Sequence, residues 1–422
     1  MTSNNTLREN SAPFCNTTDA IQKLRLRISN ALSKFPAYDT DYSLLRWLSA
    51  ENYNVEATAL KLESALYKLS AIGAFTENIN RLEDAQNVFP SITAVAEYFP
   101  GGIMGVDRDG NVICIQPMGR VRPRNLIPTA RVSELYRALI LECEASLALV
   151  RNEEKKRGHK VGVIIITDLA ELSISSIYMP ALRIYMNALQ LLQSLFPGSI
   201  IKIYVINAPS AIGFLYRIAR QALSKFQSRK GHSSSTGIFI YPVLTFQNTL
   251  DLVEFLGDNW KDALKERIGE ENILPFWGGT KQANSPTDSI RMGGEIDDRL
   301  RDEQIASLKR IPKEQLTTVC VSARRDTVIN LDVSQPRSVL SWYFTVASGD
   351  IDFWISYGSH EVWPRFRVST DFVAEYGEIC CAEKGIYTVH FDNTHGTIWS
   401  KRIDYMFQVN NKNISPSSSL PN

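Results

Sequence analysis

The sequence has no hydrophobic run long enough to cross a membrane. Its longest uninterrupted apolar stretch in the interior covers residues 161–166, with Gly162 inside it, whereas a membrane-spanning helix needs about 20 residues. The first 18 residues are rich in Asn, Ser and Thr and lack the basic start and apolar centre of a secretion signal. We therefore expect a soluble, cytoplasmic protein.

Paired cysteines and an excess of charge are also missing. The six cysteines form no Cys-x-x-Cys pair, and no set of histidines lies near them at zinc-ligand spacing, so the sequence indicates reduced thiols and no zinc site. A formal net charge of +1 disfavours nucleic-acid binding, which needs a basic surface to neutralise phosphates. With 44% hydrophobic and 22% charged residues over 422 positions, the chain is long enough for two or three globular domains.

The motifs of common enzyme classes are absent. The sequence contains no Gly-x-Ser-x-Gly, no His-Glu-x-x-His, no phosphate loop and no Gly-x-Gly-x-x-Gly that opens a helix. The tetrapeptide 278–281, GGTK, resembles a fragment of a phosphate loop but lacks its spacing, so we predict a chain-reversing turn there. The five histidines are scattered. We therefore predict a protein that is not an enzyme and holds no catalytic residues, cofactor or metal.

What is present is a change of pattern along the chain. Residues 19–80 read as helices, residues 90–281 alternate strands with helices, and residues 315–410 form short alternating strands with turn residues between them. These patterns predict an α/β domain with a helical N-terminal subdomain and a mainly parallel sheet covered by helices, followed by an antiparallel β-sandwich. We predict disordered ends over 1–18 and 411–422, and a polar linker over 282–314.

Within the α/β domain we expect helices over 131–157, 176–196 and 250–281, and strands over 161–167, 201–206 and 237–241. The stretch 201–226 organises the rest: a buried strand, a break at Pro209 and an amphipathic helix. Ile212, Leu215 and Ile218 recur on one face of that helix, and basic residues fall on others. Periodicity leaves two interpretations open, an ordinary surface helix or a lid over an apolar cavity.

Several segments resemble a known family. LLRWL (44–48), GGIMGVDRDGNVICI (101–115), TDLAELSISS (167–176), the segment 196–223 that contains INAP, and LPFWGGT (274–280) are similar to the CRAL-TRIO lipid-binding family over residues 35–281. DIDFWI (350–355) and the stretch 385–409 resemble the GOLD domain. The resemblance favours the lid interpretation and implies a lipid cavity closed by a mobile gate helix after Pro209.

The resemblance also implies a site. We predict that apolar side chains of two strands, the helix over 176–196 and the gate line the lipid cavity: Val163, Ile165, Tyr185, Leu189, Leu192, Tyr204, Ile206, Ile212, Phe214, Leu215 and Ile218. The basic residues of the gate would face anionic lipids during a transient, peripheral contact with a membrane surface: Arg217, Arg220 and Lys225.

Departures from the family pattern indicate the class of lipid. Members that transfer phosphatidylinositol carry a glutamate and a lysine where this chain has Gly198 and Gly237, and phosphatidylcholine-binding members have Ser or Thr where it has Val163 and Ile165. Burying a charged headgroup without such partners is costly. We therefore predict a weakly polar ligand, such as a tocopherol, squalene or a sterol, with phosphatidylinositol or phosphatidylcholine as a lower-ranked alternative. Glu171 replaces a usual glycine, and the sequence gives no reason for it.

Two roles remain open for such a protein. The first is binding of a hydrophobic lipid and its transfer between membranes. The second is a lipid-regulated adaptor, in which the GOLD-like region 315–410 engages a protein partner in signalling or trafficking. Its aromatic residues serve either as sandwich core or as a binding hot spot: Trp342, Phe344, Phe353, Trp354 and Trp399.

Overall fold

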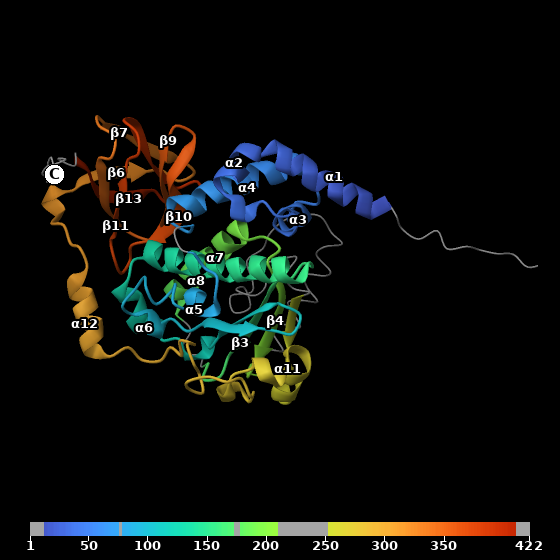
Figure 1. The fold of residues 1–422 in the computed structure, drawn as a ribbon. Helices are drawn as coiled ribbons and strands as arrows, with labels where there is room; N and C mark the ends of the chain where they lie inside the picture. Colours follow the sequence, from blue (N-terminus) through green and yellow to red (C-terminus); the bar gives the residue numbers. More distant parts are fainter. Residues whose placement is uncertain (1–11, 76–77, 173–177, 210–251, 411–422) are drawn as a thin grey trace, which may run out of the picture.

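The structure is a computed structural model that describes residues 12–75, 78–172, 178–209 and 252–410 (Figure 1). It has an N-terminal group of helices, an α/β unit and a C-terminal pair of antiparallel sheets. In Figure 1 the C-terminal sheets, orange to red, and the N-terminal helices, blue, lie side by side above the long helix α7. Among the described residues, none of the helices combines the length and the hydrophobicity that crossing a membrane requires.

The N-terminal helices pack through one apolar face each. Thr40 and Asn54 cap α3 and α4, because their side-chain oxygens accept the backbone N–H groups of Ser43 (3.1 Å) and Ala57 (3.0 Å). Leu62, Leu66 and Leu69 of α4 recur at helical spacing and are buried. The helices are α1 (Ala12–Arg27), α2 (Ser29–Lys34), α3 (Asp41–Ala50) and α4 (Val55–Ala71).

The α/β unit is built on a five-stranded sheet with the order β1-β2-β3-β4-β5. β1 and β2 form an antiparallel hairpin, and the other neighbours are parallel, so the predicted mainly parallel sheet is confirmed. The strands are β1 (Gly102–Val106), β2 (Val112–Gln116), β3 (Val163–Asp168), β4 (Ile200–Ile206) and β5 (Val253–Phe255). The helices are α5 (Leu82–Gln86), α6 (Pro123–Leu126), α7 (Val132–Arg157), α8 (Met179–Leu195) and α11 (Trp260–Ile268).

One helix prediction in this unit was wrong. The stretch 250–281, expected to be helical, contains strand β5, helix α11 and the short 3₁₀ turn Pro275–Trp277. A strand of three residues is too short to show an alternating pattern, and pairing with β4 alone defines it. The strand predicted over 237–241 lies outside the described residues.

The C-terminal part consists of two antiparallel four-stranded sheets, with the orders β10-β9-β12-β7 and β11-β8-β13-β6, as the alternating pattern predicted. Large aromatic side chains fill the space between them, among them Trp342, Phe344 and Phe353, which are almost fully buried. The strands are β6 (Thr317–Val321), β7 (Asp326–Val333), β8 (Val339–Val346), β9 (Asp350–Tyr357), β10 (His360–Ser369), β11 (Glu375–Cys380), β12 (Gly385–Asp392) and β13 (Lys401–Asn410).

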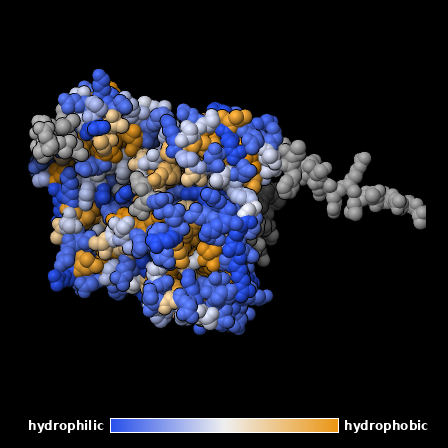
Figure 2. Space-filling view, in the orientation of Figure 1, coloured by the Kyte–Doolittle hydropathy of each residue, from blue (hydrophilic) through white to orange (hydrophobic). Residues whose placement is uncertain are grey.

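The segment before the sandwich is polar and carries helix α12 (Asp298–Ser307), none of whose residues is buried. On the face of the molecule in Figure 2, apolar residues appear as separate patches within a mainly hydrophilic surface. The sandwich contacts the rest of the chain through α4, α7 and α8. The ring of Tyr136 on α7, for example, lies 5.8 Å from that of Phe366 on β10.

Candidate functional site

The five-stranded sheet has two apolar faces, because successive side chains of a strand point to opposite sides. The register pairs Ile165 of β3 with Ile203 of β4, and Ile203 with Val253 of β5. These side chains share what we call the helix face, since Ile165 also packs in the core cluster that contains residues of α7 and α8. The opposite face carries Ile166 and Tyr204, which pack with α11 in a closed core.

Part of the helix face is not fully buried. Ile165, Ile203 and Phe255 are half-buried, whereas Val205 and Val253 beside them are buried. Together they place an apolar surface in the middle of the sheet, where a soluble core would normally cover it completely. The helix face near β4 and β5 is therefore the first wall of a candidate apolar site.

Helix α8 supplies a second apolar surface. One stripe, Ile184, Ala188 and Leu195, is buried. A second stripe at positions i, i+3, i+4 and i+7 is only half-buried: Leu182, Tyr185, Met186 and Leu189. A helix whose second apolar stripe stays partly accessible is poised to contact something apolar in addition to its own core.

Tyr185 shows what kind of surroundings this stripe has. Its side chain keeps accessible surface, yet burial raises the pKa of its hydroxyl to about 12, because neighbouring protein atoms exclude bulk water from the phenolate that would form. Accessible surface in poorly hydrated surroundings is typical of the wall of an internal cavity.

The predicted wall residues fall into three groups. Ile165, Tyr185 and Leu189 lie on the two half-buried surfaces, whereas Val163 is buried and Leu192 packs against the core cluster of α7 and α8. Tyr204 and Ile206, also predicted as wall residues, lie on the opposite face of the sheet with α11. The remaining predicted residues lie outside the described residues: Ile212, Phe214, Leu215, Ile218, Arg217, Arg220 and Lys225.

Sequence reasoning missed Ile203 and Phe255 on the sheet and Leu182 and Met186 on α8. The helical stripe could have been found, since Leu182, Tyr185, Met186 and Leu189 have i, i+3, i+4 and i+7 spacing. The strand residues could not, because both parities of β4 are apolar and only the pairing with β3 decides which side faces the helices.

Three of the sequence motifs meet at the carboxyl end of β3. The buried carboxylate of Asp168 accepts hydrogen bonds from Trp277 Nε1 (2.9 Å), Asn207 Nδ2 (2.8 Å) and the backbone N–H of Ala170 (2.9 Å). The Asp-Leu motif, the INAP motif and the PFW motif are thus joined by one side chain. The end of β4, where the predicted gate begins, is held in place by this contact.

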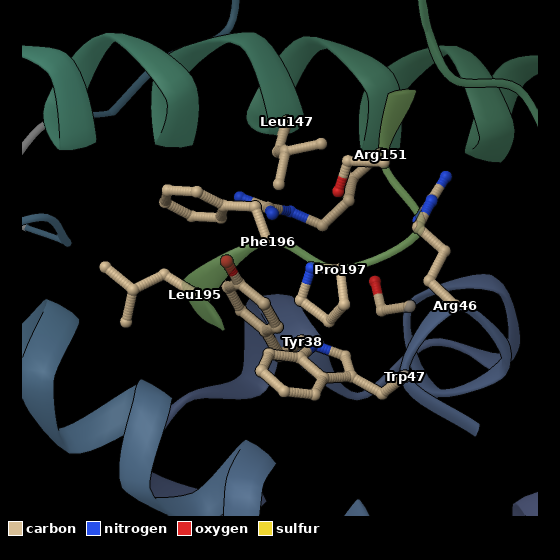
Figure 3. A pocket seen from close by; sticks show the side chains of 10 residues that line it. Tyr38, Arg46, Trp47, Leu147, Arg151, Leu195, Phe196 and Pro197 are labelled. Atoms are coloured by element: carbon tan, nitrogen blue, oxygen red, sulfur yellow. The ribbon is translucent and has the colours of Figure 1, made fainter. Parts of the chain in front are cut away.

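A small pocket lies between the N-terminal helices, α7 and the end of α8 (Figure 3). Its empty space is about 290 Å³ only when the adjoining open solvent is included, so the enclosed part is far smaller than the roughly 300–1,000 Å³ of small-molecule pockets. The two arginines that line it are each paired with a buried glutamate of α7. Glu144 accepts hydrogen bonds from Tyr38 Oη (2.5 Å) and Arg151 (2.5 Å), and Arg46 forms an ion pair with Glu154. We assign this cavity to the contact between the two subdomains.

Comparison with known proteins agrees with this arrangement. The family model described as the CRAL/TRIO domain matches residues 96–233. Residues 96–233 are thus similar to the CRAL/TRIO domain. Such domains bind lipids and are generally not enzymes, which is consistent with the apolar walls of the sheet and α8.

The proteins to which this chain is similar are longer than the chain itself. It is similar to Protein real-time of Aedes aegypti, with 23% identity over 340 residues (78% of this chain, 47% of the relative). It is also similar to Protein real-time of Drosophila melanogaster, with 22% identity over 353 residues (76% and 48%). The chain spans about half the length of these relatives. The crystal structure of Sfh5 aligns with a TM-score of 0.43 and 13% identity, over 71% of this chain and 99% of that one.

The glutamate that replaces a usual glycine of the CRAL/TRIO pattern now has an explanation. Glu171 has a φ of 66°, in the left-handed region that favours glycine. Its carboxylate pairs with Arg120 (3.2 Å) and Arg122 (3.5 Å). The ion pairs offset part of the backbone strain, and they connect the turn after β3 to residues 118–122.

The position that carries a glutamate in phosphatidylinositol-transferring members has a backbone conformation that favours glycine here. Gly198 has a φ of 66°, and a Cβ atom added to it would lie 3.1 Å from the backbone oxygen of Arg46. A side chain at this position would be strained by the backbone angle and crowded by α3. The glycine found here in place of the glutamate therefore matches the local backbone conformation.

Proposed function

We propose that this CRAL/TRIO-like domain binds a weakly polar lipid, of the tocopherol, squalene or sterol type, and transfers it between membranes. The observation that carries the proposal is the pair of half-buried apolar surfaces, one on the helix face of the sheet and one on α8. Each methylene removed from water contributes about 0.8 kcal/mol, so a chain of sixteen carbons corresponds to roughly 13 kcal/mol. A cavity that shields such a chain lowers the barrier to leaving a membrane.

The preference for a weakly polar ligand follows from the wall chemistry. Ile165, Ile203, Phe255 and Leu189 carry no polar side-chain atoms. The polar groups beside them are the hydroxyl of Tyr185, whose pKa is raised to about 12, and that of the half-buried Thr167, which pairs with Val205 on the same face of the sheet. One hydroxyl or none on the ligand fits such walls, whereas a phosphate would be left without compensating charge.

The gate remains a proposal from the sequence. The stretch with Ile212, Leu215 and Ile218, and the basic residues Arg217, Arg220 and Lys225, lies outside the described residues. We place it in the proposed transfer cycle as the segment that uncovers the cavity at a membrane surface. Replacing Leu215 and Ile218 by Asp is expected to abolish lipid uptake while the fold survives, and unchanged uptake would remove the gate from the proposal.

The walls are tested by filling the cavity. Leu189→Trp and Ile203→Trp each add bulk on one of the two half-buried surfaces, and each is expected to reduce uptake of a fluorescent sterol or tocopherol analogue at least tenfold. Leu60→Trp is the matched control, because Leu60 is 65% exposed on α4. Equal uptake by all three variants would contradict the placement of the ligand between the sheet and α8.

A second role is favoured by one contact, that of a lipid-regulated adaptor. The hydroxyl of Tyr136 on α7 lies 3.3 Å from the carbonyl oxygen of Ile184 on α8 and 3.1 Å from that of Arg367 on β10. A ligand that shifts α8 would change this contact with the GOLD-like sandwich. Deleting residues 315–422 separates the roles: transfer between vesicles persists for a transfer protein, whereas an adaptor loses its cellular effect.

A further inference from the structure

The most exposed apolar group of the sandwich is a pair of neighbouring residues in the loop between β12 and β13. Ile398 is 73% exposed and Trp399 is 78% exposed, the highest value among the large hydrophobic side chains of the described residues. A tryptophan held outside the core leaves a large apolar area in water, and the adjacent Ile398 makes that apolar area contiguous, as it is at interaction sites.

Hydrogen bonds hold the base of this loop in place. The buried side chain of Asn393 donates to three backbone oxygens, those of Val321 (3.2 Å), Ser322 (3.2 Å) and Trp399 (3.0 Å). The backbone N–H of Arg324 donates to the oxygens of Asn393 (3.0 Å) and Gly396 (3.1 Å). One asparagine thus closes the 393–399 loop on itself and joins it to the 322–325 loop, so the base holds the exposed pair at the surface.

Basic groups surround the exposed pair. Arg324 and Arg325 lie exposed on the joined loop, and the half-buried Lys401 and the exposed Arg402 follow Trp399 after Ser400. Most of the nearby acids are already paired: Asp404 with Arg402 (3.3 Å), Asp352 and Asp392 with Arg365 (2.6 Å each), and Asp350 with Arg367 (3.0 Å). Asp326 remains beside Arg324 and Arg325. The surface is therefore apolar at its tip and positively charged around it.

We propose that this loop pair, residues 322–325 and 393–402, docks the protein on the surface of an anionic phospholipid bilayer. Trp is the residue that favours the boundary between headgroups and acyl chains, and isoleucine beside it adds apolar area that the boundary can cover. The surrounding Arg and Lys side chains complement anionic headgroups. A protein partner would need a groove that fits Ile398 and Trp399 and an acidic rim around it. No feature of the described residues points to such a partner.

The loop pair lies at the end of the sandwich that faces α8. Lys401 Nζ donates to the oxygen of Ser348 (3.0 Å), and the neighbouring Gly349 N–H donates to Asp371 (3.3 Å). Phe372, next in the chain, places its ring 6.0 Å from that of Tyr178, the residue before α8. Docking through Trp399 would thus bring the start of α8 toward the bilayer. The docking stands independently of the proposed function, whereas the role of this orientation rests on it.

The test is sedimentation of the full chain with phosphatidylcholine vesicles, with and without phosphatidylserine. The expected result is binding that depends on phosphatidylserine, a blue shift of tryptophan emission on binding, and at least a tenfold loss of binding in Ile398→Ala/Trp399→Ala. Trp399→Phe is expected to lose most of the emission shift. Arg324→Gln/Arg325→Gln is expected to remove most of the difference between anionic and neutral vesicles.

The matched control is Leu60→Ala, because Leu60 is a hydrophobic residue that is 65% exposed on α4; this variant is expected to bind vesicles as the parent does. Absence of vesicle binding by the parent, or equal binding by Ile398→Ala/Trp399→Ala, would overturn the proposal. It would also be overturned if Ile398→Ala/Trp399→Ala lost the binding of a protein partner but still bound vesicles as the parent does. Loading of a sterol analogue from detergent is measured in parallel. Failure of loading would overturn the proposed function and leave the docking result standing.

Discussion

The hydroxyl of Ser133, near the start of α7, donates a 2.7 Å hydrogen bond to the carboxyl group of Glu375, the first residue of β11. Both residues are buried. Arg131 adds to the contact, because its guanidinium lies 4.4 Å from the ring centre of Tyr376. The sandwich is therefore attached to the CRAL/TRIO-like domain through a buried polar contact that contains an ionisable group.

The contact is expected to depend on pH. Burial raises the pKa of Glu375 from 4.5 to about 7, against the opposing effects of Arg131 and Ser133. Because the folded state holds the proton more tightly than the unfolded state, the stabilisation is present in full below pH 4.5 and is lost as the pH rises through about 7. Urea unfolding of the full chain between pH 5 and 8 should show stability falling across this range.

Glu375→Gln is the control for this pH dependence, since the amide oxygen still accepts from Ser133 and has no charge to titrate. The variant is expected to remove most of the decline between pH 5 and 8. A decline of equal size in parent and variant would assign it to other groups.

The hydrogen bonds on Asp168 predict a large effect of a single substitution. Asp168→Ala leaves the buried Trp277 Nε1 and the half-buried Asn207 Nδ2 without their acceptor, and a buried unsatisfied donor costs about 1–3 kcal/mol. We expect a loss of several kcal/mol in the free energy of unfolding, measured in urea. Phe276→Leu is the neighbouring control, since Phe276 is 45% exposed, and it should cost much less.

The ion pair of Arg46 and Glu154 predicts non-additive effects. Both side chains are buried, and among the described residues Arg46 Nε and Glu154 Oε2 have no hydrogen-bond partner. Arg46→Met alone should cost about 3–5 kcal/mol, because it leaves a buried charge unpaired. Arg46→Met/Glu154→Leu should recover more than half of that loss. Additive losses in a double-mutant cycle would show that the charges act independently.

Gly198 gives a prediction about ligand class. If the missing glutamate alone excluded phosphatidylinositol, Gly198→Glu would introduce it as a ligand. Given the φ of 66° and the nearby backbone of Arg46, we expect instead a destabilisation of about 1 kcal/mol or more and no transfer of radiolabelled phosphatidylinositol. Gly158→Glu is the control, because Gly158 also has positive φ but has open space around it.

The sequence was sufficient for the large elements. The helices α7 and α8 and the strands β3 and β4 follow from periodicity, and the alternating strands of the sandwich follow from a clear two-residue pattern. It could not place β5, since three residues carry no pattern, nor decide which side of β4 faces α8, since Ile203 and Tyr204 are both large and apolar. Long-range pairing made those decisions. The meeting of Asp168, Asn207 and Trp277 also needed the fold, because Trp277 is 109 residues from Asp168 along the chain.

The central claim is that a weakly polar lipid lies between the helix face of the sheet and α8. Its most direct test is native mass spectrometry, with solvent extraction, of the full chain after incubation with a mixture of phospholipids, sterols, squalene and tocopherol. We predict one bound sterol, squalene or tocopherol molecule in the parent, and loss of that molecule in Leu189→Trp and Ile203→Trp but not in Leu60→Trp. Bound phosphatidylinositol, or a bound lipid that all three variants retain, would contradict it.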